Sequence, residues 1–173
     1  MRLGVDEVGV TELMGVTEHA ICMVTVAGAL LLDSLADGSA LIPLVEPARA
    51  DGDVRMLLEE IAATARTTMG RDSIPTVWNV IARNPHYLAS TWRKEQVVMG
   101  AGALAARDKR RVALGVAMNA RSRYMIEYHT AVLRRAGDSN DDLLEILGVV
   151  DHYNALNTLS DGMQIESDIR PFP

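Results

Sequence analysis

The chain has 173 residues, a formal net charge of −6, and an apolar fraction of 49% with only one Phe and two Trp. This length suits one domain with a substantial core. The net negative charge argues against nucleic acid and against anionic membrane surfaces as partners, because both bind basic faces. The core has to be built mainly from Leu, Val, Ala, Ile and nine Met, and this composition favours an all-α fold.

The only cysteine, Cys22, excludes an internal disulfide and a Cys-x-x-Cys redox pair. It lies in the apolar run Ala20-Ile-Cys-Met-Val, so we expect a buried and unreactive thiol. A reactive thiol, or one between subunits, is the alternative. No spacing of His, Cys, Asp and Glu indicates a metal site, and no motif indicates a cofactor.

Residues 1–40 are predicted to form an N-terminal extension that is partly helical. A helix is expected over Glu12–Leu35, with Asp37-Gly38-Ser39 as its stop signal. Its apolar surface indicates burial against the rest of the domain or against another subunit. A flexible extension and a start codon placed too early remain alternatives. The uncharged run Ala20–Leu32 is shorter than the roughly 20 residues that span a bilayer, and acidic residues precede it, so we expect a cytoplasmic protein.

Residues 41–173 are predicted to form the main domain, which begins with an extended connector at Ile42–Pro47. The apolar periodicity, the glycines and the prolines then divide the chain into helices, and no alternating strand pattern is present. The predicted helices run from Asp51 or Asp53 to Met69, from Thr76 to Arg83, from Asn84-Pro85 to about Gly100, from Ala106 to Ala120, from Ser122 to Ala136, and from Ser139 to about Ser160. The basic run Lys109-Arg110-Arg111 is interpreted as a solvated helix face rather than a phosphate site.

The segment Ser122-Arg-Tyr-Met125-Ile-Glu-Tyr-His129 carries the most information about function. On a helix, Ser122, Met125 and His129 share one face. The segment resembles the motif helix of the carboxymuconolactone decarboxylase and alkylhydroperoxidase D superfamily, in which redox-active members carry Cys-x-x-Cys-x-x-x-His. The resemblance covers about residues 42–165. It includes Ala113-Leu-Gly-Val-Ala-Met-Asn before the motif and the run from Val149 to Gly162 after it.

This resemblance implies an AhpD-like all-α bundle of about six to seven helices that assembles into a homo-oligomer, with a trimer or hexamer preferred. Thiol-peroxidase chemistry is not expected, because Ser122 and Met125 replace both cysteines and Arg110 stands where the family pattern has a glutamate. A serine hydroxyl has no accessible thiolate state, and a thioether offers only sulfoxide formation.

The decarboxylase branch of the superfamily lacks the cysteine pair and keeps the histidine. It therefore implies lyase-type or isomerase-type proton transfer, without a cofactor, on a small carboxylated or carbonyl compound. A ligand-binding or structural protein without redox activity is the main alternative, and a peroxidase that uses Cys22 is a weaker one.

The same resemblance suggests roles for individual residues. His129 would act as general acid or base, since an imidazole titrates near neutral pH. Tyr124 would donate a hydrogen bond in catalysis, and Arg110 or Arg123 would hold a carboxylate through its two-pronged guanidinium. The remaining candidates for substrate binding are Ser122, Met125, Tyr128 and Asn154. Asn154 shares a helix face with Asn157, and bonding between helices or subunits is its alternative role.

Overall fold

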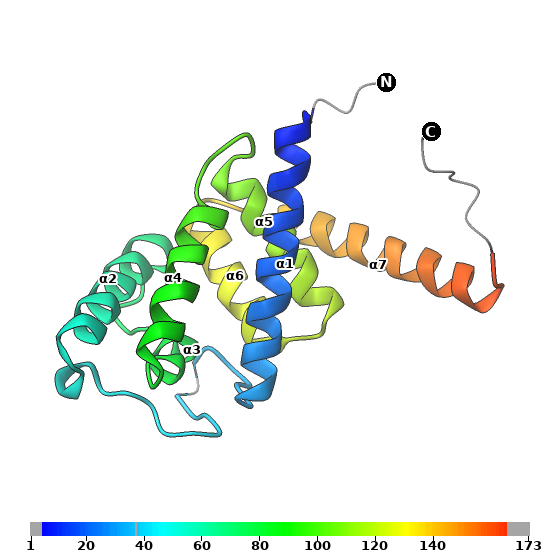
Figure 1. Ribbon diagram of the computed structural model, residues 1–173. Helices are drawn as coiled ribbons and strands as arrows, with labels where there is room; N and C mark the ends of the chain where they lie inside the picture. The colour runs from blue at the N-terminus through cyan, green and yellow to red at the C-terminus, as the bar shows by residue number, and fades with distance from the viewer. Residues whose placement is uncertain (1–4, 37, 166–173) are drawn as a thin grey trace.

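The computed structural model describes residues 5–36 and 38–165, and in this part of the chain it contains seven α-helices, one 3-10 turn and no strand (Figure 1). The all-α prediction is confirmed. The terminal residues of the two predicted regions and Asp37 of the predicted stop signal lie outside the described residues. The elements are α1 (Glu7–Ala29), η1 (Pro47–Arg49), α2 (Gly52–Met69), α3 (Thr76–Ile81), α4 (Pro85–Met99), α5 (Ala106–Asn119), α6 (Arg123–Arg135) and α7 (Asn140–Gly162).

The helix ends from α2 onward agree with the start and stop signals in the sequence. Gly70 ends α2 in a left-handed conformation with φ 67°, which glycine adopts without steric cost. Asn84 accepts a hydrogen bond from the backbone N–H of Tyr87 at 3.1 Å and thereby caps α4. Ser139 and Asp142 form a reciprocal capping box at the start of α7.

The first helix differs from its predicted range of Glu12–Leu35. It begins at Glu7, because Asp6 accepts a hydrogen bond from the backbone N–H of Gly9 at 2.8 Å and acts as the N-cap. It ends at Ala29, and the following Leu31 has a left-handed φ of 55° that turns the chain away from the helix axis. The predicted range was therefore wrong at both ends.

Helix α1 packs along α4, α5 and α6 (Figure 1). The carboxylate of Glu12 accepts hydrogen bonds from the backbone N–H groups of Ala103 and Leu104 at 3.0 and 2.9 Å, and lies 3.0 Å from Lys109 Nζ. Among the described residues, α1 is also the helix whose length and apolar composition would suffice to cross a membrane. Its inner face is nevertheless buried in the domain, through Val16, Ala20, Met23 and Ala27.

The main core lies between α1, α2, α3, α4 and α6. At its centre the rings of Trp78 and Trp92 meet edge to face, with centroids 5.1 Å apart and an interplanar angle of 84°. The motif helix α6 contributes Tyr124 and Met125, which are both fully buried. The site therefore has a rigid apolar support on one side.

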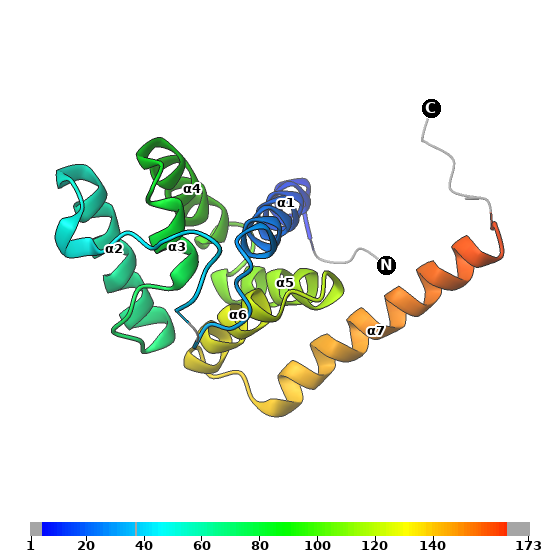
Figure 2. The same cartoon turned by 90° about the horizontal axis from the view of Figure 1, so that it is seen from below.

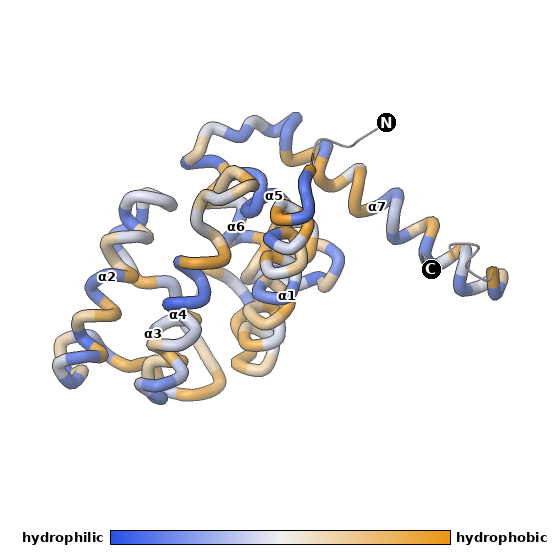
Figure 3. Tube along the Cα trace, turned by 45° about the horizontal axis from the view of Figure 1, so that its top comes forward, coloured by the Kyte–Doolittle hydropathy of each residue, from blue (hydrophilic) through white to orange (hydrophobic). Residues whose placement is uncertain are grey.

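Helix α7 extends away from the rest of the domain (Figures 1 and 2). None of its residues is buried, and its contacts with the domain are mainly with α5. Figure 3 shows hydrophobic segments along its whole length, alternating with hydrophilic ones. The large exposed apolar side chains on α7 and just beyond it are Leu144, Leu147, Val149, Tyr153, Leu156, Leu159, Met163 and Ile165.

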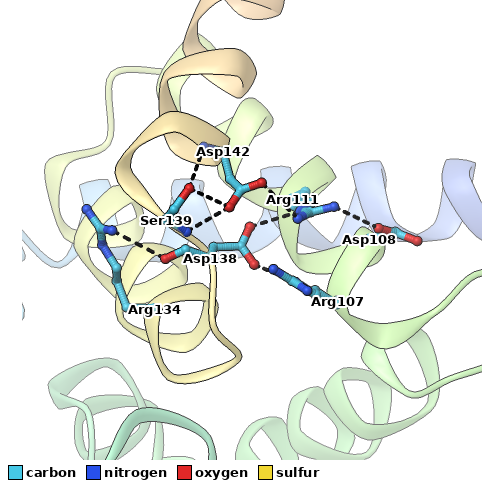
Figure 4. Close-up of polar contacts among 7 residues, drawn as sticks. All are labelled: Arg107, Asp108, Arg111, Arg134, Asp138, Ser139 and Asp142. Atoms are coloured by element: carbon cyan, nitrogen blue, oxygen red, sulfur yellow. Dashed lines mark hydrogen bonds and ion pairs between the residues drawn. The ribbon is translucent and has the colours of Figure 1, made fainter.

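A network of ion pairs holds the start of α7 (Figure 4). The Asp138 carboxylate accepts hydrogen bonds from Arg107 Nε at 2.5 Å and from Arg111 Nε at 2.9 Å. Arg134 Nη1 donates to the backbone oxygen of Asp138 at 3.3 Å. Because α5 supplies Arg107 and Arg111, this network fixes the turn between α6 and α7 against α5.

Candidate functional site

Four helices bring together a group of polar side chains, which we call the Glu95 cluster: His19 from α1, Glu95 from α4, Arg110 from α5, and Tyr128 and His129 from α6. Glu95 Oε2 accepts a hydrogen bond from His19 Nε2 at 2.6 Å. Glu95 Oε1 accepts one from Arg110 Nη2. Four of the five residues are buried, and the Arg110 side chain is 14% exposed.

The position of Glu95 follows from the periodicity of α4. The buried residues of this helix are Leu88, Trp92, Glu95 and Met99, so the carboxylate occupies one place in an apolar stripe. His19 similarly lies between the buried Val16 and Met23 on α1. Neither Glu95 nor His19 was among the predicted site residues. An ionisable residue at stripe spacing was the signal that could have revealed both.

The run Lys109-Arg110-Arg111 is not a solvated helix face, contrary to the prediction. Lys109 is buried and its Nζ donates to the backbone oxygen of Gly100 at 2.7 Å. Arg110 is directed to Glu95, and Arg111 to Asp138. Each of the three cations thus has an acceptor within the fold, because α5 lies between α1, α4 and the turn that leads to α7.

The charges in the cluster keep Glu95 ionised. Burial alone would raise the pKa of Glu95, but the positive charge of Arg110 and the hydrogen bond from His19 outweigh it and lower the pKa to about 2. The carboxylate is therefore an acceptor at neutral pH.

His129 is a buried, neutral imidazole. Burial lowers its pKa, the positive charge of Arg110 lowers it further, and the pKa falls to about 3. Neither Nδ1 nor Nε2 has a hydrogen-bond partner among the described residues. Buried polar atoms are normally paired, so the unpaired N–H group and the unpaired acceptor nitrogen of this ring are unusual.

The two candidate tyrosines occupy different places. The Tyr128 ring lies edge to face with His129, with centroids 5.4 Å apart, and its centroid is 5.9 Å from the Arg110 guanidinium carbon. Burial raises the pKa of Tyr128 to about 12. The Tyr124 hydroxyl accepts a hydrogen bond from the backbone N–H of Val77 at 3.1 Å, and burial raises its pKa as well. Both are neutral phenols at neutral pH.

A cleft of about 220 Å³ opens beside the cluster. Glu95, Arg110 and Tyr128 line it, whereas His129 does not. Its other walls come mainly from α2, α3 and α4. The remaining lining residues are Ile61, Thr64, Ala65, Thr68, Pro75, Trp78, Trp92, Gln96, Met99 and Gly100.

The other predicted site residues lie outside this cleft. Ser122 is the N-cap residue of α6 and Met125 is buried in the core. Arg123 is exposed and directed to Glu127, with Nε to Oε1 at 3.1 Å. Asn154 is exposed on α7, beside a shallow depression formed by that helix alone. Of the predicted residues, Arg110 and Tyr128 therefore line the cleft. His129 contacts the Tyr128 ring without lining the cleft, and Asn154 lies apart on α7.

Cys22 is exposed on the outer face of α1 and not buried, which corrects the prediction. Its thiol donates a hydrogen bond to Glu18 at 3.1 Å, and this bond raises the pKa of the thiol. A raised pKa reduces the thiolate fraction that reacts with peroxides. Within the described residues, no group of three or more His, Cys, Asp or Glu side chains is placed to bind a metal.

Comparison with known proteins places this architecture in a family. The carboxymuconolactone decarboxylase family model matches residues 85–165, which run from α4 through α7. The solved alkylhydroperoxidase AhpD core from Rhodospirillum rubrum ATCC 11170 is similar with a TM-score of 0.63 and 26% sequence identity, over 73% of this chain and 93% of that chain. No curated protein matches the chain. The chain belongs to the carboxymuconolactone decarboxylase and AhpD-like superfamily.

Proposed function

We propose that this protein is a cofactor-independent enzyme that transfers protons on a small carboxylated or carbonyl compound, in a lyase-type or isomerase-type reaction. The observation that carries the proposal is the Glu95 cluster, in which acidic, basic and neutral proton-carrying groups meet beside a cleft. The cleft is smaller than the pockets of about 300–1,000 Å³ that hold drug-sized ligands, so its ligand is a small molecule.

The residues of the cluster have different proposed roles in the reaction. His129 is neutral and has both ring nitrogens unpaired among the described residues, so its proposed role is to accept a proton transiently. Its pKa of about 3 argues against the general-acid role, because the resting side chain is not an imidazolium at neutral pH. Tyr128 contacts the His129 ring and lines the cleft, and it can donate a hydrogen bond to a carbonyl oxygen. Arg110 supplies the positive charge that stabilises a developing enolate or carboxylate.

The test is turnover on a panel of small lactones, 2-oxo acids and unsaturated carboxylic acids in D2O, followed by NMR. We expect deuterium at a carbon next to a carbonyl or carboxyl group of at least one compound, and a rate reduced about a hundredfold or more in His129→Gln. His86→Gln is the matched control, since His86 is exposed on α4. Turnover by His129→Gln at the control rate would remove His129 from the mechanism.

The alternative is a protein that binds a ligand or has a structural role, without turnover. It is favoured by the replacement of both motif cysteines by Ser122 and Met125. Native mass spectrometry of the protein and of His129→Ala separates the two readings when combined with the turnover assay. A bound mass without turnover on any compound would support the alternative. An alkylhydroperoxidase role for Cys22 is opposed by the raised pKa of its thiol.

We also propose that the chain forms a homo-oligomer, with a trimer or hexamer preferred over a dimer. Exposed apolar side chains run along the whole of α7, and a monomer rarely leaves such a surface uncovered. The Asp138 network directs this helix away from its own domain, so a second copy is its proposed partner. Leu147→Glu should reduce the mass measured by light scattering, whereas Glu145→Gln should not. An unchanged mass for Leu147→Glu would exclude this contact.

A further inference from the structure

We propose that the cleft beside the Glu95 cluster binds the carboxylate of a small aromatic or unsaturated acid. In this proposal the ligand carboxylate replaces Glu95 as the ion-pair partner of Arg110. This inference rests on the proposed function and deepens it, because it names the group that the substrate presents and the residues that recognise it.

Two buried N–H donors that have no partner in the described part of the chain belong to residues that line the cleft. Trp92 is 3% exposed, and its Nε1 has no hydrogen-bond partner among the described residues. Arg110 uses Nη2 for Glu95, while its Nη1 is buried and has no partner in the same part of the chain. Both residues line the cleft. Two N–H donors, one of them charged, match the acceptors of a carboxylate.

Among the described residues, the cleft is lined by one positive and one negative side chain. Arg110 is the cation that lines the cleft, and Glu95 is the anion that faces it. The other groups around Glu95 are His19 on α1 and Tyr128 and His129 on α6, while the cleft residues of α2 and α3 are uncharged. An incoming carboxylate therefore competes with Glu95 for one guanidinium. When Glu95 loses that partner, His19 remains to stabilise its charge against the effect of burial, so the hydrogen-bonded pair of Glu95 and His19 takes up one proton from solvent.

The walls of the cleft are partly apolar. Ile61, Trp78, Trp92 and Met99 form the apolar part, and the volume of about 220 Å³ admits a single ring with one substituent. Ligands that are planar, unsaturated and anionic at one end combine these features. Saturated polar molecules such as sugars would leave the apolar walls without contacts.

Benzoate is a suitable probe, and benzamide is its neutral counterpart of similar shape. The chain has two tryptophans, Trp78 and Trp92, and both line the cleft, so tryptophan fluorescence reports occupancy directly. We expect benzoate to change the fluorescence in a saturable way and benzamide to bind about tenfold more weakly or less. Equal binding of the two would overturn carboxylate recognition, and so would no binding of benzoate.

Two variants that should change benzoate affinity in opposite directions test whether the ligand replaces Glu95 as the partner of Arg110. Glu95→Gln removes the competing charge and keeps the side-chain shape, so the dissociation constant of benzoate should fall by about tenfold or more. Arg110→Gln should weaken benzoate binding by at least the same factor. The exposed pair Glu46 and Arg49 supplies matched controls, because Glu46→Gln and Arg49→Gln change the net charge equally without touching the cleft.

Calorimetry in two buffers with different ionisation enthalpies measures the proton. We expect the protein to take up close to one proton per benzoate bound, and Glu95→Gln to take up none. If Glu95→Gln folds poorly, as shown by its melting curve, Glu95→Met removes the same charge and provides the comparison. Benzoate affinity that is insensitive to residue 95 would overturn the exchange.

The two proposals fail in distinguishable ways. Benzoate binding with the expected responses, but no turnover on any acid, would retain the carboxylate site and reject the enzyme. Turnover of an uncharged carbonyl compound, with no response to benzoate, would retain the enzyme and reject the carboxylate site.

Discussion

Glu95 and Asp138 are both buried carboxylates that α5 supplies with arginines, yet their surroundings differ. The Asp138 side chain is fully buried and each of its oxygens accepts a hydrogen bond from an arginine. No atom of this network is among the buried polar atoms without a partner. Around Glu95, by contrast, such atoms are found on His19, Trp92, Arg110 and His129.

The difference separates a structural network from a site. Arg107 and Arg111 are partly exposed, so their remaining N–H groups reach water and the Asp138 network is complete in itself. The Glu95 cluster leaves donors unpaired beside a cleft, which lowers stability unless a ligand supplies the acceptors. Ion pairs between arginine and a buried carboxylate thus fix the start of α7 at Asp138, whereas at Glu95 they leave donors available for a ligand.

The largest expected effect on stability is at Asp138. Asp138→Asn leaves Arg107 and Arg111 without their shared anion, and we expect the free energy of unfolding to fall by about 3 kcal/mol. Denaturant unfolding measures this change. The exposed pair of Arg66 and Asp72 is the control, and Asp72→Asn should change the free energy by less than about 0.5 kcal/mol. Similar losses for both variants would contradict the assigned role of Asp138.

The next largest expected effect is a pH dependence of the free energy of unfolding that comes from His129. Its pKa of about 3 in the folded protein lies below the ordinary 6.5, so the unfolded chain takes up a proton first as the pH falls. The stability that depends on His129 is complete above pH 6.5 and is lost between pH 6.5 and 3, at up to about 1.4 kcal/mol per pH unit.

His129→Gln should remove this slope, whereas His86→Gln, at an exposed position on α4, should retain it. Measurements between pH 6.5 and 4.5 isolate His129 from Glu95, because the stabilisation by Glu95 is lost only as the pH falls from 4.5 towards 2. Parallel curves for wild type and His129→Gln would show that the imidazole is not buried in its neutral form.

A smaller effect is expected when the Glu95 pair is replaced as a unit. Glu95→Met with Arg110→Met removes both charges, and we expect the free energy of unfolding to stay within about 1 kcal/mol of wild type, or to rise. Benzoate binding should be lost in the same protein. A loss of stability as large as that of Asp138→Asn would show that Glu95, like Asp138, mainly stabilises the fold. The proposed difference between the two carboxylates would then be wrong.

The smallest effect is expected at Cys22. Cys22→Ser should change the free energy of unfolding by less than about 0.5 kcal/mol, because the side chain is exposed. The variant should also leave hydroperoxide consumption, measured by a peroxide assay, at the wild-type background. A loss of peroxide consumption in Cys22→Ser would revive the thiol-peroxidase reading.

Most of the fold could be predicted because its signals are local. Gly70, Asn84-Pro85 and Ser139 act within one helical turn, and the structure places helix ends at these points. The boundaries of α1 were less accessible. Asp6 as an N-cap competes with several other acidic residues in the sequence, and the positive φ of Leu31 has no local signature such as glycine.

The site could be predicted only in part, because its central contacts join distant segments. His129 and Arg110 were found through the resemblance of the motif helix, but the bond between His19 and Glu95 links residues 76 positions apart. No periodicity shows which stripes of two helices will face each other. Asn154 was assigned to the site on its helix face alone, and the direction of α7 depends on Asp138, outside that helix.

The docking of α1 also has a consequence for the order of folding. The segments that cover its apolar face, α4 to α6, are synthesised much later than α1 itself. Contacts between distant segments form slowly because a long loop has to close first. The nascent chain therefore exposes α1 until residues beyond Arg110 are available, and the Glu95 cluster is completed among the last parts of the domain.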